Sequence, residues 1–265
     1  MPDRITDPFP LLGSTYWWAC PSTRQKGRAL MYPPPSGYPA PPPPPLQPVR
    51  GVALFAVAAL ICDSAVGVVA AVIDLWYAGM VDRMIVDPYS VPDSEITTGD
   101  LVYGLSGIVE TVVYVVAVVA FLVWLYRVRA NAEILSPGGH RRGRPWLIIG
   151  WVVPIINFWF PKQIVDDIWY ASTRAGQESA PSRGLINVWW AAWLIASLVS
   201  NLAGRLLFGA EELDSLAAAA RFDVVSITLM LVAALLAIGV IRKISDAQEQ
   251  HLPAPAAFAP GYPAY

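Results

Sequence analysis

The sequence predicts an all-α integral membrane protein with four transmembrane helices and one additional proline-broken segment. Hydrophobic residues make up 55% of the 265 residues and charged residues only 14%, which is more apolar surface than a soluble domain of this size can bury. Four apolar runs, at about 51–76, 101–127, 187–208 and 224–241, are each long enough to cross a hydrocarbon core of about 30 Å. A lone strand cannot satisfy its backbone in lipid, so these runs are expected to be helices.

The composition excludes several classes of function. The formal net charge is −2, and no basic stripe outside the membrane flanks suggests a nucleic-acid partner. The two cysteines, Cys20 and Cys62, and the two histidines, His140 and His251, are too dispersed for a disulfide framework or a metal site. No nucleophile–base set, zinc-protease motif or phosphate-binding glycine loop is present. We therefore expect a protein that is not an enzyme, with no cofactor and no metal.

Both ends of the chain are proline-rich. Residues 1–48 and 246–265 have the composition of disordered tails, and the prolines of the first favour an extended polyproline II spacer. Such tails act as tethers or bind protein partners. The composition changes near Met31, and we hypothesise that translation starts there.

The first two spans each carry a carboxylate within the apolar run. Span 51–76 contains Asp63, span 101–127 contains Glu110, and residues 78–100 are expected to form a polar loop between them. Counted from the two membrane faces at about 1.5 Å per residue, both carboxylates lie at a similar depth. A charge there costs about 2.5–3.5 kcal/mol, so both should face the interior. They either share a proton or a cation, or are neutral and join helices through Ser64, Ser106, Thr111 or Asn201.

Residues 145–161 decide the topology. The stretch is short for a span, and Pro154 with Asn157 interrupts it. A re-entrant segment gives four spans with both termini in the cytoplasm, and a crossing segment gives five. The re-entrant alternative places more of the 18 lysines and arginines on the inside, as the positive-inside rule favours. Asn157 either lines a cavity or caps the turn, and residues 162–174 have the apolar spacing of an interfacial helix.

The last two spans, 187–208 and 224–241, are joined by an acidic loop. The third span contains Asn201 and, near its outer end, Arg205. Arg205 either extends its guanidinium to the interface or pairs with an acid of a neighbouring helix. The candidate partners are Asp74, Glu110 and Asp223.

Four motifs in order resemble a bacterial membrane family known as domain of unknown function 4328. They are Arg129-Ala-Asn131-Ala-Glu133, Gly150-Trp151-Val-Val-Pro154-Ile-Ile-Asn157, Pro161 with Asp167-Ile168-Trp169-Tyr-Ala171-Ser172, and Trp189-Trp190 with Trp193. The resemblance covers about residues 50–245. It implies a multi-helix membrane domain, often behind a proline-rich tail, and it assigns no activity and no catalytic residue.

Two groups of residues are therefore candidate sites. The first is the intramembrane set of Asp63, Glu110, Asn157, Asn201 and Arg205. The second is a cytoplasmic motif of Arg129, Asn131, Glu133, Asp167 and Trp169, in which the residues of the second helix would dock the 162–174 helix through Asp166 or Asp167.

The functional prediction is a membrane-embedded interaction or assembly module of the cell membrane. Its expected partners are the lipid bilayer, proteins that bind the proline-rich tails, and further copies of itself. The alternative is a small ion- or proton-coupled transporter whose pathway includes Asp63, Glu110 and Asn157, because transporters often use broken helices.

Overall fold

A computed structural model describes residues 44–173, 182–210 and 212–252. The hypothesised start at Met31 and most of both predicted tails lie outside these residues. The described part of the chain is entirely helical, with four long helices that are apolar enough to cross a membrane. They are α1 (Arg50–Val86), α2 (Asp93–Leu135), α5 (Gly184–Phe208) and α6 (Leu213–Glu249). The predicted fold class is confirmed.

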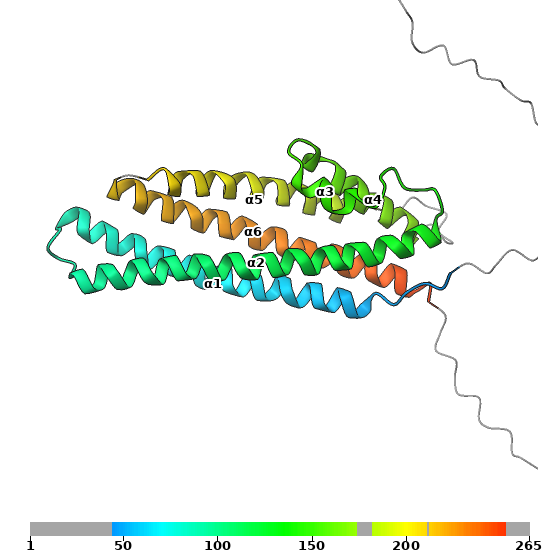
Figure 1. Cartoon of the computed structure of the whole chain (residues 1–265), viewed down its shortest axis with the longest axis horizontal. Helices are drawn as coiled ribbons and strands as arrows, with labels where there is room; N and C mark the ends of the chain where they lie inside the picture. Colours follow the sequence, from blue (N-terminus) through cyan, green and yellow to red (C-terminus); the bar gives the residue numbers. More distant parts are fainter. Residues whose placement is uncertain (1–43, 174–181, 211, 253–265) are drawn as a thin grey trace, which may run out of the picture. The chain divides into compact units, whose positions relative to one another are not determined.

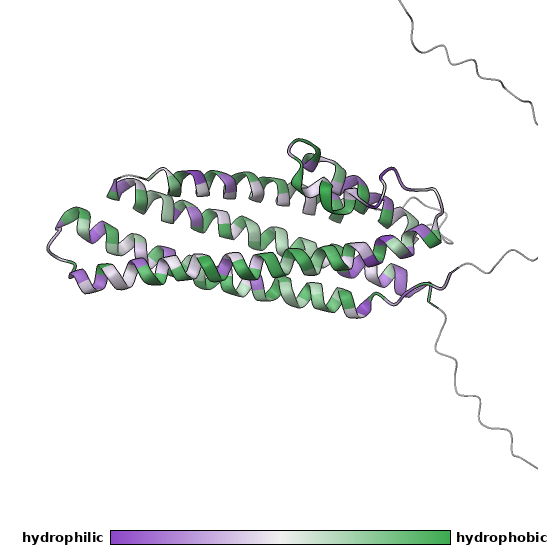
Figure 2. Ribbon diagram, viewed as in Figure 1, coloured by the Kyte–Doolittle hydropathy of each residue, from purple (hydrophilic) through white to green (hydrophobic). Residues whose placement is uncertain are grey.

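The long helices extend well beyond the apolar runs that predicted them. The expected polar loop at 78–100 is wrong: α1 continues to Val86 and α2 begins at Asp93. Hydropathy detects only the part of a helix that lies in lipid, whereas a helix tolerates polar residues wherever its backbone bonds remain within the segment. Figure 2 shows hydrophobic residues dominating the middle of the long helices and hydrophilic residues concentrated near the loops.

The helices pack in the order α2, α1, α6, α5. Helix α1 contacts α2 on one side and α6 on the other, and α6 in turn packs against α5 (Figure 1). Buried alanines line these contacts, and small residues let membrane helices approach closely. Among them are Ala53, Ala56, Ala117, Ala120 and Ala237.

The proline-broken segment folds as three short pieces. They are α3 (Trp146–Val152), the 3-10 turn η1 (Ile156–Phe158) and α4 (Phe160–Thr173), and the axis bends by 109° at the break. Ile155, next to Pro154, has a φ of 70°, which is unfavourable for a β-branched residue. Helix α2 ends and α5 begins at the same end of the long helices (Figure 1). Such a bent pair is either a broken span, which would make five crossings, or a re-entrant loop, which would leave four.

Helix α4 differs from the expected interfacial helix. An amphipathic helix lying on the membrane would expose its polar face, but Asp166 is only 3% exposed and Asp167 only 6%. The apolar face is buried as well, since Ile164 and Ile168 are fully covered. Helix α4 packs against α2, α5 and α6. It is therefore an internal element of the helix assembly, and its carboxylates need partners there.

Candidate functional site

A network of arginines and carboxylates lies where α2 ends and the loop to α3 begins. Arg129, which is 3% exposed, donates from Nε to Glu133 at 2.9 Å and from Nη2 to the backbone oxygen of Arg142 at 2.7 Å. Arg144 donates two hydrogen bonds to the other Glu133 oxygen, at 2.9 and 2.6 Å. Glu133 thus joins two guanidiniums and fixes the path of the loop.

The same loop holds α4. Asp167 accepts hydrogen bonds from the backbone N–H and from Nε of Arg141, both at 2.9 Å. Arg142 donates to the side chain of Gln163 at 3.1 Å, and Lys162 pairs with Asp166 within α4 at 2.8 Å. Helix α4 does pack against α2, but among the described residues Arg129, Asn131 and Glu133 make no hydrogen bond to Asp166 or Asp167. The loop binds both helices, because Arg141 and Arg142 bind α4 and Arg144 binds Glu133 of α2.

The pKa values of two groups beyond the apolar run of α2, Glu133 and His140, are both lowered, for different reasons. Burial raises the pKa of Glu133, but hydrogen bonds from Arg144 and Arg129 outweigh it, so that the pKa is lowered overall. Burial lowers the pKa of His140, and the charge of Arg129 lowers it further. Glu133 is therefore ionised and His140 neutral at neutral pH.

A second polar cluster joins the two ends of the described chain. Asn131 accepts from the backbone N–H of Gln47 at 2.9 Å and donates to its oxygen at 2.7 Å. Asn131 also donates to Gln248 at 3.2 Å. Gln248 is 1% exposed and donates to the oxygen of Val128 at 2.8 Å and to Ser172 at 3.0 Å. Sequence reasoning missed Gln47 and Gln248, which it placed in the tails.

Glu249 completes this cluster. Its Oε1 accepts hydrogen bonds from the backbone N–H groups of Val49 and Arg50, at 2.8 and 2.9 Å. These groups lie at the start of α1, where helix N–H donors lack partners within the helix. The last turn of α6 therefore caps the first turn of α1, and the two ends of the described chain lie beside each other.

Aromatic side chains cover the broken segment. Trp190 and Trp193 stack with ring centroids 4.9 Å apart, and Trp151 meets both edge to face at 6.0 and 5.3 Å. Trp190 also donates to the oxygen of Phe158 at 3.1 Å. Trp169 of α4 is buried beneath the ammonium of Lys243, 4.6 Å from its ring centroid. The Asn157 Oδ1 is buried and has no hydrogen-bond partner among the described residues, so the side chain does not cap the turn.

The intramembrane acids face the contact between α1, α2 and α6. A Cβ placed on Gly67 would lie 3.9 Å from Oε1 of Glu110 and 3.5 Å from Ile227 of α6. Asp63 is one helical turn from Gly67, so the two predicted carboxylates lie at similar depth. No hydrogen bond joins them among the described residues.

Three of the four polar side chains proposed to hold these acids bond to their own helices instead, and the buried hydroxyl of Ser64 has no hydrogen-bond partner among the described residues. Ser106, Thr111 and Asn201 donate to backbone oxygens three or four residues earlier, at 2.7–2.8 Å. Arg205 is exposed and has no ion pair among the described residues, so its predicted pairing with an acid is not observed. A guanidinium near the outer end of α5 instead suits extension to the interface.

Two further acids that sequence reasoning placed outside the site lie near Glu110. Asp74 is 4% exposed, and its Oδ2 has no hydrogen-bond partner among the described residues. Asp74 and Asp223 both lie within electrostatic range of Glu110. The spacing of Asp63, Gly67 and Asp74 along one face of α1 was the signal that could have placed Asp74 inside. Within the described ranges, no three His, Cys, Asp or Glu side chains are arranged to hold a metal ion.

These features define the class of the protein: a multi-pass α-helical membrane protein with a proline-broken, tryptophan-lined segment and an arginine-rich loop. The chain belongs to the family described as Domain of unknown function (DUF4328), which matches residues 87–246. The predicted family is confirmed, and its match begins after α1, later than the expected residue 50. No curated protein and no solved structure matches the chain.

Proposed function

We propose that this protein is an assembly module of the cell membrane, which anchors two proline-rich tails side by side at the cytoplasmic face and carries out no catalysis. The observation that supports this role is the cluster joining the chain ends. Gln47, just before the start of α1, is bound by Asn131, and Asn131 is bound to Gln248 at the end of α6.

The buried amides of this cluster support a role in holding the two tails at fixed positions. Buried amides must each find partners, since an unsatisfied one costs about 1–3 kcal/mol. A chain that needed only a membrane anchor would have no use for fixing the points where its tails leave. The cytoplasmic orientation rests on the arginines of the loop between α2 and α3, because short cytoplasmic loops are enriched in Lys and Arg.

Replacement of both tails tests the proposal. In the test variant, residues 1–43 and 253–265 are replaced by Gly/Ser linkers of equal length, which keep the length of each tail but remove the prolines. The partner proteins crosslinked to this variant in living cells should be recovered at least tenfold less than with the wild type. A matched chain with scrambled loop residues 87–92 should keep its partners. Unchanged recovery with both linkers would remove the basis for the proposal.

Labelling from outside intact cells tests the orientation. Cys20 in the first tail and a cysteine introduced by Ala264→Cys in the second should both resist a membrane-impermeant maleimide and react after permeabilisation. A cysteine introduced by Ser90→Cys, in the loop between α1 and α2 at the opposite end of the helices, is the control and should react in intact cells. Reaction of the Ala264→Cys variant in intact cells would show that the broken segment crosses the membrane.

Proton- or ion-coupled transport is a second candidate function, and the position of Asp74 and Asp223 near Glu110 favours it. Intramembrane acids that face the interior of a helix bundle often serve as relays. If the protein transports protons or coupled ions, Glu110→Gln and Asp63→Asn should each reduce the pH-driven uptake of these ions into proteoliposomes at least tenfold, without loss of folded protein. The exposed Asp214→Asn should have no effect. Wild-type liposomes without pH-driven uptake would exclude this function.

A further inference from the structure

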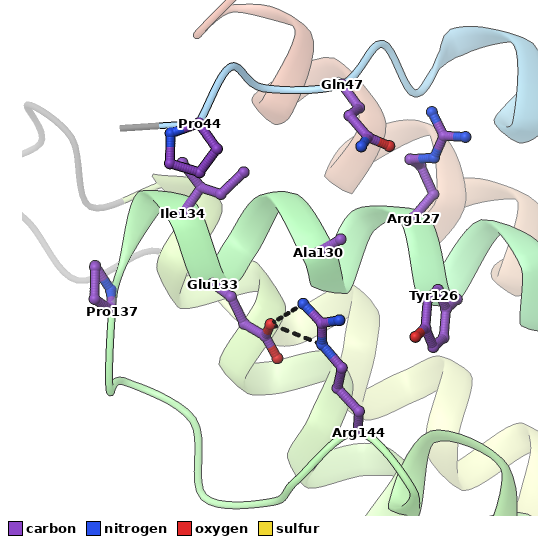
Figure 3. Close-up of a pocket in the computed structure, with 9 residues that line it drawn as sticks. All are labelled: Pro44, Gln47, Tyr126, Arg127, Ala130, Glu133, Ile134, Pro137 and Arg144. Atoms are coloured by element: carbon purple, nitrogen blue, oxygen red, sulfur yellow. Dashed lines mark hydrogen bonds and ion pairs between the residues drawn. The ribbon is translucent and has the colours of Figure 1, made fainter. Parts of the chain in front are cut away.

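A groove runs along the outward face of α2 near its end. It has a volume of about 590 Å³ and is lined by Pro44, Gln47, Tyr126, Arg127, Ala130, Glu133, Ile134, Pro137 and Arg144. Figure 3 shows Ala130 on α2 between two walls, with Gln47 and Arg127 on one side and Glu133 and Arg144 on the other. The small alanine leaves the floor of the groove open.

The groove carries excess positive charge. Glu133 is its carboxylate, and it is already bound by Arg129 behind the groove and by Arg144 at the wall. Arg127, on the opposite wall, makes a single long hydrogen bond of 3.4 Å to the oxygen of Pro48 among the described residues. The charged residues that line the groove are Arg127, Arg144 and Glu133, so the lining has a net charge of +1. Arg127 retains donors that a ligand can take.

The groove lies at the end of an apolar stripe on the same face of α2. Val112, Val116, Val119 and Val123 are spaced by one helical turn and are 58%, 48%, 52% and 47% exposed. No other described helix covers them. The stripe is about 16 Å long at 1.5 Å per residue, close to the thickness of one leaflet of a hydrocarbon core of about 30 Å. Tyr126, an aromatic residue suited to the interface, separates the stripe from the arginines.

We propose that this groove binds an anionic phospholipid, with the phosphate over Ala130 between Arg127 and Arg144 and an acyl chain along the valine stripe. Guanidiniums bind phosphate oxygens through paired charge-assisted hydrogen bonds. Basic pockets at the cytoplasmic level of membrane helices bind anionic headgroups, and each added cation there strengthens binding by about fivefold. The alignment of headgroup site and apolar stripe on one helix face distinguishes a phospholipid from a soluble phosphate.

Native mass spectrometry of the full chain in detergent, with added phosphatidylglycerol, tests the site. Two variants act on different properties of the groove. Arg127→Gln removes charge and should weaken lipid binding by about fivefold. Ala130→Leu fills the floor without changing charge, and it should reduce binding by at least as much. Leucine has high helix propensity, so the exposed α2 surface should keep its fold.

Arg242→Gln is the matched control. Arg242 is an exposed cation near the C-terminal end of α6. Its loss should leave phosphatidylglycerol binding unchanged. An equal loss in Arg242→Gln would mean that general surface charge attracts the lipid, and that would overturn the proposal. Equal retention of phosphatidylcholine or of free inorganic phosphate by the wild type would overturn it too. So would undiminished binding by both groove variants in folded protein.

Discussion

Replacement of Trp124 by alanine is expected to lower the free energy of unfolding by about 4 kcal/mol, because it empties a large volume in the core. Trp124 is completely buried, and its indole Nε1 donates to Ser245 at 2.9 Å. Its ring also lies 5.4 Å from that of Phe121. The substitution removes these contacts and leaves the hydroxyl of α6 without its donor. In mild detergent the midpoint of thermal unfolding should fall by about 10 °C.

Two further variants separate packing from hydrogen bonding at this position. Trp124→Phe keeps most of the aromatic contact and loses the bond to Ser245, so we expect a loss of about 1–2 kcal/mol. Tyr89→Ala, at a side chain that is 97% exposed, should leave the midpoint unchanged. A shift in Trp124→Ala no larger than that in Tyr89→Ala would contradict the assignment of Trp124 to the core.

Replacement of Gln248 by leucine should cost about 3 kcal/mol, because one amide links three helices. Its Nε2 donates to α2 at Val128 and to α4 at Ser172, and its Oε1 accepts from Asn131. Leucine fills similar volume but removes all three hydrogen bonds of the buried amide, each worth about 1 kcal/mol. Urea unfolding monitored by circular dichroism in detergent measures the loss.

Gln250→Leu is the matched control for this prediction. Gln250 is exposed two residues later and interacts through its backbone at the end of α6, so the change should be within about 0.5 kcal/mol. A double-mutant cycle with Asn131→Leu should show coupling between the two amides. Strict additivity of the two substitutions would show that the cluster does not act as a unit.

The local sequence pattern was sufficient to predict the four long helices and the broken segment. Hydropathy identified all four long helices because insertion in lipid depends on apolar content summed over a single segment. Pro154 predicted the break before α4, since a proline removes a helix hydrogen bond wherever the chain places it. The ordered motifs from Arg129 to Trp193 predicted the family, which matches residues 87–246.

The partners of the polar residues depended on the tertiary structure. Sequence reasoning expected the second helix to dock the 162–174 helix through Asp166 or Asp167, whereas the fold buries both and binds Asp167 to Arg141 of the intervening loop.

The sequence by itself thus determined the class of the protein, the four membrane helices and the broken segment, because each follows from the properties of one contiguous stretch. Only the tertiary structure decided which polar groups meet: Gln47 with Asn131, and Gln248 with Ser172. Such pairings depend on how each helix is rotated and where it crosses its neighbours, and packing of the whole assembly sets both.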